Sequence, residues 1–158
     1  LIDAIVKTNL RLDIYGQGEL QDELELYAQK EGAQVTFKGI ISNSELPAIL
    51  NQYHYFILPS KYEGMPKALL EAMASNLIVF GSNISGIKDI LSDTPENLFQ
   101  EGDSVDLKNK LKKALFLDKN KLKKQIIKNR NKIKKYYSIE LETLRHENIY
   151  TQDIKDCM

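Results

Sequence analysis

The most constraining feature of this 158-residue chain is an apolar run that passes through a Gly-x-Pro turn into a helix. The apolar residues Tyr55–Leu58 predict a buried strand that ends at Pro59. Gly64 and Pro66 then form a tight loop, and Pro66 is typical of the first position of a helix, where no N–H is needed. Residues 68–74 are good helix formers. The free N–H groups at such a helix start form a ready site for an anion.

Two carboxylates flank this predicted helix start. Glu63 lies in the loop, and Glu71 lies in the second helical turn. We expect the N–H groups of Lys67, Ala68 and Leu69 to point out of the helix between them. The alternative to a binding site is an ordinary strand–loop–helix unit whose two glutamates are merely solvated. The strand, the turn and the helix in one segment favour a binding site.

The composition indicates one domain with a real core. No apolar stretch approaches the roughly 20 residues of a membrane span, and no signal peptide is visible. The single cysteine, Cys157, excludes a disulfide or a cysteine metal site within the chain and fits a reducing compartment. His54 and His146 are too few for a metal cluster, so we expect no metal.

Strand and helix patterns alternate along the chain. Strands are expected over residues 12–15, 35–37, 55–58, 77–80 and 97–99. A first helix is expected to end near Thr8. Further helices are expected over residues 20–28, 46–50, 66–74, 87–91 and 105–116. This order predicts a parallel sheet with helices on both faces. Ligands bind beyond the carboxyl ends of such strands, where the Gly16, Gly39 and Glu63 loops all lie, so we expect one composite site.

The segment LPS-x-x-EG-x-P-x-x-LLEAMA, residues 58–74, resembles the donor-site motif of family-4 glycosyltransferases, which are retaining sugar-nucleotide enzymes of the GT-B fold. Weaker matches support it. Gly16-Gln17-Gly18-Glu19 resembles the family's G-x-G turn, Val35–Gly39 its V-x-F-x-G strand, Ser85–Asp89 its G-G-x-x-E turn, and residues 137–150 its C-terminal pattern.

The resemblance implies the C-terminal half of a GT-B fold, a Rossmann-like three-layer α/β domain with a parallel sheet whose first strand is missing. We expect residues 1–135 to form this nucleotide-sugar-binding domain, truncated at its N-terminus. Residues 136–158 are then a C-terminal helix and tail that reach an absent N-terminal domain.

The implied function is transfer of a hexose from a nucleotide-diphospho-sugar, expected to be a UDP-sugar, with retention of configuration. The acceptor is a glycan or a lipid-linked acceptor. The resemblance also implies bacterial polysaccharide biosynthesis in the cytoplasm or at the inner membrane face, without a cofactor or a required metal.

The resemblance also assigns roles to residues. Glu63 is expected to contact the donor sugar near the positive charge that develops at the anomeric carbon, as the catalytic residue. Glu71 is expected to accept hydrogen bonds from the ribose hydroxyls. The other expected donor-binding residues are Gly64, Met65, Pro66, Lys67, Ala68, Leu69, Gly16, Gly18, Lys38, Gly39 and Ile40.

Some family features fall outside the sequence. The first strand and the following Arg and Lys, which bind the diphosphate, would precede Leu1, and so would the acceptor domain with its sugar-facing histidine. We therefore expect the 158-residue chain alone to show no transferase activity.

Two alternatives remain at this stage: a nucleotide-sugar epimerase half of the same architecture, and a non-catalytic nucleotide- or dinucleotide-binding module. Gly16–Gln21 lacks the third glycine of the dinucleotide fingerprint, and Lys38 stands where that fingerprint has an acid.

Charge is unevenly distributed although the net charge is zero. Residues 108–135 carry 13 basic residues and one acidic residue, whereas residues 1–107 carry 7 basic and 16 acidic residues. Leu122, Ile126, Ile133 and Tyr137 fall on one helical stripe, so a membrane-surface helix is one interpretation. A core-packed helix with a solvated basic face is favoured, because the stripe is narrow and lacks Trp and Phe. Nucleic acid is not expected as a partner.

Overall fold

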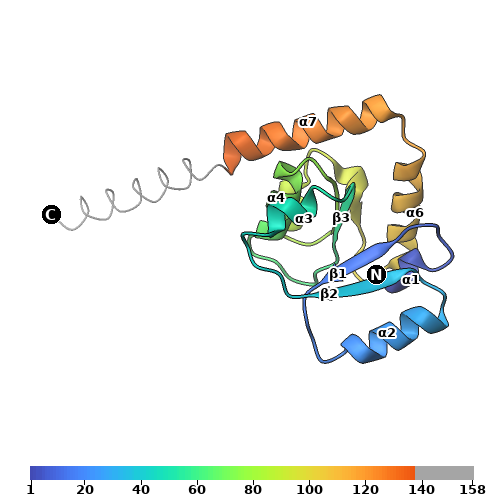
Figure 1. The fold of residues 1–158 in the computed structure, drawn as a ribbon. Helices are drawn as coiled ribbons and strands as arrows, with labels where there is room; N and C mark the ends of the chain where they lie inside the picture. The colour runs from blue at the N-terminus through green and yellow to red at the C-terminus, as the bar shows by residue number, and fades with distance from the viewer. Residues whose placement is uncertain (138–158) are drawn as a thin grey trace.

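The computed structural model describes residues 1–137, in which parallel strands alternate with helices (Figure 1). The strands are β1 (Leu12–Tyr15), β2 (Val35–Gly39), β3 (Tyr55–Leu58), β4 (Ile78–Ser82) and β5 (Leu98–Phe99). The α-helices are α1 (Ile2–Ile5), α2 (Gln21–Lys30), α3 (Leu46–Leu50), α4 (Lys67–Ala74), α5 (Ile87–Ile90), α6 (Ser104–Leu115) and α7 (Lys119–Tyr136), and a 3₁₀ turn, η1, covers Pro95–Asn97.

Every strand pairing in the described residues is parallel, apart from one isolated bridge between Gly16 and Gly39. β1 pairs with β2 in one sheet, and β3, β4 and β5 pair in that order in a second sheet. The expected Rossmann-like α/β architecture is therefore confirmed.

β4 is buried along its whole length because helices cover both faces of its sheet. Side chains of a strand alternate between faces. Val79 joins a cluster with Leu69 and Met73 of α4, whereas Ile78 and Phe80 join a second cluster. The second cluster is completed by α1 and α6, including Ala4, Ile5, Leu107 and Leu111.

An apolar cavity of about 600 Å³ separates the two sheets, with β1 and β3 on its two sides. The strands lie in the order β2, β1, β3, β4 and β5, with the cavity between β1 and β3. A strand inserted in the cavity and numbered first would turn this into 3-2-1-4-5-6, the usual doubly wound order. The cavity thus lies at the position of the first strand in that order.

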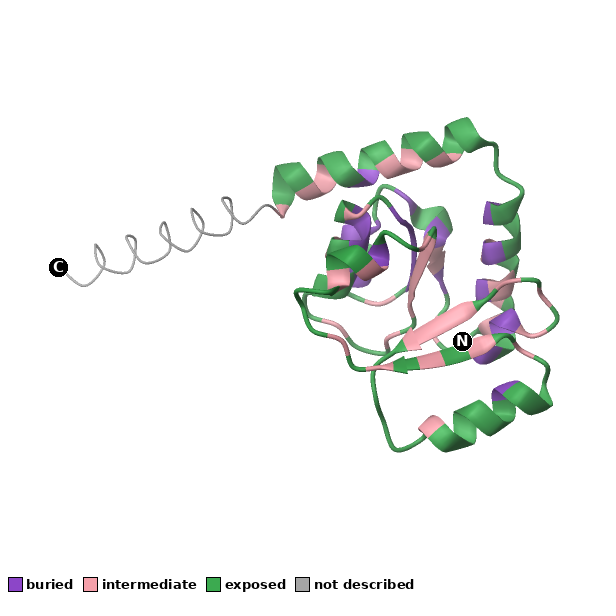
Figure 2. Ribbon diagram, viewed as in Figure 1, coloured by how far each residue is buried: buried purple, intermediate pink, exposed green. Residues whose placement is uncertain are grey.

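Helix α7 packs along the domain through the apolar stripe anticipated from the sequence. Leu122 and Ile126 pack against the cluster around Phe80, and Ile133 and Tyr137 pack against the cluster around Met73. Figure 2 shows that the opposite face of α7 is exposed. The interpretation as a core-packed helix is confirmed for this stripe.

Several element limits differ from expectation by one or two residues, among them those of β2, β4, α2 and α6. Pro66 is the N-cap of α4 and not its first residue, with ψ near 85°. Asn97 belongs to the 3₁₀ turn and not to β5, and its Nδ2 donates to the Val79 carbonyl at 2.8 Å. The predicted C-terminal helix near Ile149 lies outside the described residues.

Candidate functional site

The carboxyl ends of the first three strands meet around one end of the apolar cavity. Gly16 follows β1, Ile40 follows β2 and Pro59 follows β3, and all three line the cavity together with Ala68 of α4. Three residues predicted for the donor site, Gly16, Ile40 and Ala68, therefore border one space. The deeper part of the cavity is lined by apolar side chains, including Leu1, Ile5 and Leu111.

The loop after β3 holds Glu63 in a half-buried position. The hydroxyl of Ser60 donates to Glu63 Oε1 at 2.7 Å and orients the carboxylate. Ser60 was not predicted as a site residue. Its spacing to Glu63 matches the [ST]-x-x-[DE] pattern, which could have indicated this hydrogen bond.

Gly86, which precedes α5, lies directly against the Glu63 loop. A Cβ atom at Gly86 would lie 2.6 Å from the Glu63 carbonyl oxygen and 2.7 Å from that of Gly64. Its φ of 82° is also in the left-handed region that favours glycine. The Glu63 loop therefore packs directly against the Gly86 backbone, where there is no room for a side chain.

The start of α4 is less open than expected. The Leu69 N–H donates to the Pro66 carbonyl at 3.0 Å, so it is not a free donor as predicted. Among the hydrogen bonds of the described residues, the N–H groups of Lys67 and Ala68 have no partner. Glu71 is exposed on the next turn. Two backbone donors and one carboxylate thus remain accessible at this helix start.

The two glycine turns of β1 and β2 are joined to each other. The Gly16 N–H donates to the Gly39 carbonyl at 2.8 Å, and both residues have positive φ. Gly18 lines a second pocket of about 260 Å³ between Gly16, Leu20 and Phe37. These turns bring backbone, without bulky side chains, to the edge of the site.

A hydrogen-bonded network at the end of β1 was not anticipated from the sequence. The Tyr53 hydroxyl donates to Asp13 Oδ2 at 2.6 Å, and the Tyr15 hydroxyl lies 2.7 Å from the Tyr53 hydroxyl. Lys38 Nζ lies 3.4 Å from the same Asp13 oxygen. Burial raises the pKa of Tyr53 far above its ordinary value, and the bond to Asp13 adds to the shift, so Tyr53 remains a donor. The Lys38 ammonium is thereby paired, and Met65 and Lys67 stay exposed.

No three His, Cys, Asp or Glu side chains of the described residues gather as a metal site. Within residues 1–137, no helix is both long and apolar enough to cross a bilayer.

Residues 1–133 match the family model for glycosyl transferases group 1. The chain belongs to this family. Its structure also resembles sucrose-phosphate synthase from Thermosynechococcus elongatus, with a TM-score of 0.84 and 21% identity over 98% of this chain and 41% of that one. The described domain is accordingly the C-terminal domain of a GT-B glycosyltransferase.

Two curated relatives are each 31% identical to this chain over the residues that they match. The sulfoquinovosyl transferase SQD2 of Arabidopsis thaliana matches over 66% of this chain and 21% of its own length. An Escherichia coli enzyme named UDP-Gal:alpha-D-GlcNAc-diphosphoundecaprenol alpha-1,3-galactosyltransferase matches over 65% of this chain and 28% of its own length. The chain therefore spans less than a third of the length of these relatives.

Proposed function

We propose that this domain binds a nucleoside-diphosphate sugar where its strands end, and that it supplies the donor half of a retaining hexosyltransferase. The observation that carries the proposal is the placement of Glu63. Ser60 and Gly86 fix this half-buried carboxylate immediately before the start of α4. The start of α4 suits an anionic diphosphate, and the neighbouring Glu63 carboxylate suits a sugar that develops positive charge.

The roles divide between the loop and the helix. The free N–H groups of Lys67 and Ala68, with the positive end of the α4 dipole, bind the diphosphate. Glu71 accepts hydrogen bonds from the ribose, and Glu63 faces the donor sugar. The Gly16 and Gly39 turns let the nucleotide approach the backbone.

We assign UDP as the carrier and a lipid-linked glycan as the acceptor, in bacterial polysaccharide synthesis at the cytoplasmic membrane face. Support comes from the Escherichia coli relative, whose name specifies UDP-Gal and a diphosphoundecaprenol acceptor. The acceptor would be held by a separate N-terminal domain.

An epimerase half of the same architecture is the second candidate. It would convert a nucleotide sugar into its epimer without transfer to an acceptor. A non-catalytic nucleotide-binding module would bind the nucleotide and leave the sugar bond intact. Product analysis therefore separates all three.

In a protein that carries this domain together with an acceptor domain, Glu63→Gln is expected to lower kcat by about 10²-fold or more, because the neutral amide no longer stabilises the developing positive charge. The exposed Glu23 of α2 provides the control, since Glu23→Gln removes the same charge from a residue that lines neither pocket. Proton NMR of the product should show retained anomeric configuration. An inverted product, or equal kcat for Glu63→Gln and Glu23→Gln, would contradict the proposal. The 158-residue chain alone is expected to transfer no sugar.

A further inference from the structure

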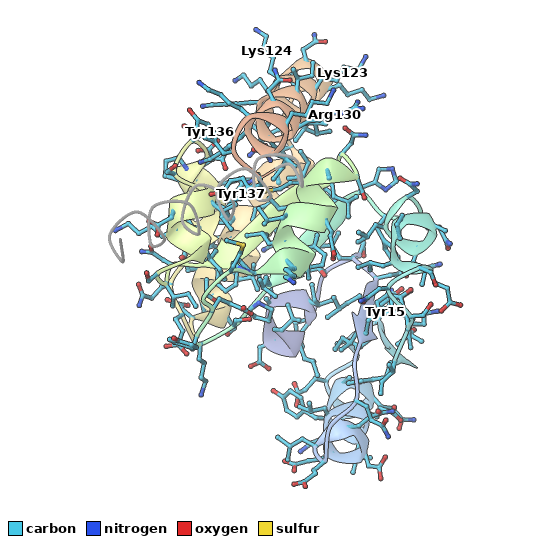
Figure 3. All side chains as sticks on the ribbon, turned by 90° about the vertical axis from the view of Figure 1, so that its left-hand side faces the viewer. Tyr15, Lys123, Lys124, Arg130, Tyr136 and Tyr137 are labelled. Atoms are coloured by element: carbon cyan, nitrogen blue, oxygen red, sulfur yellow. The ribbon has the colours of Figure 1, made fainter. Side chains whose placement is uncertain are left out.

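The outer face of α7 is rich in exposed basic residues, with Ile127 exposed among them. Figure 3 shows Lys123, Lys124 and Arg130 extending away from the body of the domain. No acidic residue occurs between Lys119 and Tyr136. We define the basic face by seven exposed residues: Lys119, Lys121, Lys123, Lys124, Arg130, Lys134 and Lys135. At 1.5 Å per residue, this face extends about 25 Å along the helix.

These seven cations differ from Lys128 and Lys132 of the same helix, here called the inner lysines because their amino groups bond to the domain. Lys132 Nζ lies 3.4 Å from Asp93 Oδ2 and 2.8 Å from Ser92 Oγ, and Lys128 Nζ donates to the Asp93 carbonyl at 2.8 Å. The inner lysines thus fasten α7 to the domain. In the described part of the chain, none of the seven forms an ion pair with a carboxylate.

An exposed apolar corner adjoins the N-terminal end of the basic face. Phe116, between α6 and α7, is 89% exposed, and its neighbours Leu115 and Leu117 are also exposed. Lys112 and Lys113 precede this corner and are exposed as well. An aromatic side chain surrounded by lysines suits the boundary between lipid headgroups and acyl chains.

An acidic helix surface lies at the end of the domain far from α7. Helix α2 carries Asp22, Glu23 and Glu25 on an exposed surface, and it lies opposite α7 in the molecule (Figure 1). The zero net charge therefore conceals a charge dipole. Such a dipole turns the α7 end toward an anionic surface and the α2 end away from it.

We propose that the basic face of α7 and the Phe116 corner dock this domain on an anionic lipid bilayer. Each basic residue near such a surface strengthens binding roughly fivefold, and Phe116 inserts at the interface. The apolar stripe of α7 takes no part, because it is packed against the domain. A bilayer fits better than a nucleic acid because a flat surface can meet the whole face and the apolar corner together. The proposal is independent of the donor site.

The test is sedimentation of the 158-residue chain with vesicles of phosphatidylcholine, alone or mixed with phosphatidylglycerol. We expect binding only to the mixed vesicles, weakening as salt is added. The triple change Lys123→Glu, Lys124→Glu and Arg130→Glu should weaken that binding about a hundredfold or more. The control makes the same charge change at exposed lysines elsewhere, as Lys7→Glu, Lys30→Glu and Lys61→Glu, and should bind nearly as well as the unaltered chain.

A second pair of variants tests the apolar corner. Phe116→Ser should weaken binding to the mixed vesicles about tenfold. Val105→Ser provides the control, because Val105 is 65% exposed at the other end of α6. Circular dichroism confirms that each variant is folded. Equal sedimentation with both vesicle types, equal loss in the two triple variants, or tighter binding to a duplex oligonucleotide than to the mixed vesicles would overturn the proposal.

Discussion

Gly86→Ala is expected to lower the free energy of unfolding by about 2–4 kcal/mol. The new Cβ would lie 2.6 and 2.7 Å from two backbone carbonyl oxygens of the Glu63 loop, so the loop must move. The φ of 82° adds strain that alanine does not tolerate well. Urea unfolding measures the loss of stability. Titration with nucleotide should also show weaker binding, because the displaced loop carries Glu63.

Gly102→Ala separates strain from steric contact. Gly102 has a similar φ of 76°, but a Cβ there would meet no atom within 4 Å. We expect a loss of only about 1 kcal/mol and no effect on nucleotide binding. Equal losses in the two variants, with binding unaffected by either, would show that the Gly86 backbone does not support the Glu63 loop.

Supplying a strand to the cavity between β1 and β3 is expected to raise the free energy of unfolding by about 3 kcal/mol. The strand would be supplied as an extension added before Leu1. The extension would consist of five Val and Ile residues, then a loop, then a crossover helix that runs into α1. A parallel neighbour of β1 needs such a crossover, and α1 already leads into β1. Urea unfolding and hydrogen exchange of β1 and β3 amides measure the gain.

A matched extension controls for added length. It keeps the loop and crossover but replaces the five strand residues with Gly and Ser, which cannot fill an apolar space. We expect no gain in stability and no added protection in β1 or β3. The same stability for both extensions would mean that the cavity does not accept a strand.

Much of the fold could be predicted because apolar runs end at clear stop signals. The limits of β1 and β3 agree with prediction, since Gly16 and Pro59 terminate them. The predicted element boundaries were wrong where tertiary contacts determine the local structure. Asn97 reads as part of a strand, yet its side chain is used to satisfy the buried Val79 carbonyl. Pro66 caps α4 from outside because the Leu69 N–H turns back to its carbonyl.

The candidate site was predictable where one segment carries it and unpredictable where distant segments meet. Glu63 and Glu71 belong to one continuous motif. The contact of Gly86 with the Glu63 loop joins residues 23 positions apart, and no local pattern encodes it. The same holds for Tyr53, which meets Asp13 across 40 positions. Such pairs are set by the packing of the sheets.

Calorimetric titration of the chain with UDP, ADP and GDP tests the central claim, that the strand ends form a donor-nucleotide site, most directly. We expect UDP to bind, and Glu71→Ala to weaken that binding about 10- to 100-fold because the ribose hydroxyls lose a charged acceptor. The control Glu23→Ala, on the exposed surface of α2, should bind UDP as the unaltered chain does. Failure of all three nucleotides to bind, or equal affinity for UDP with and without Glu71, would contradict the account.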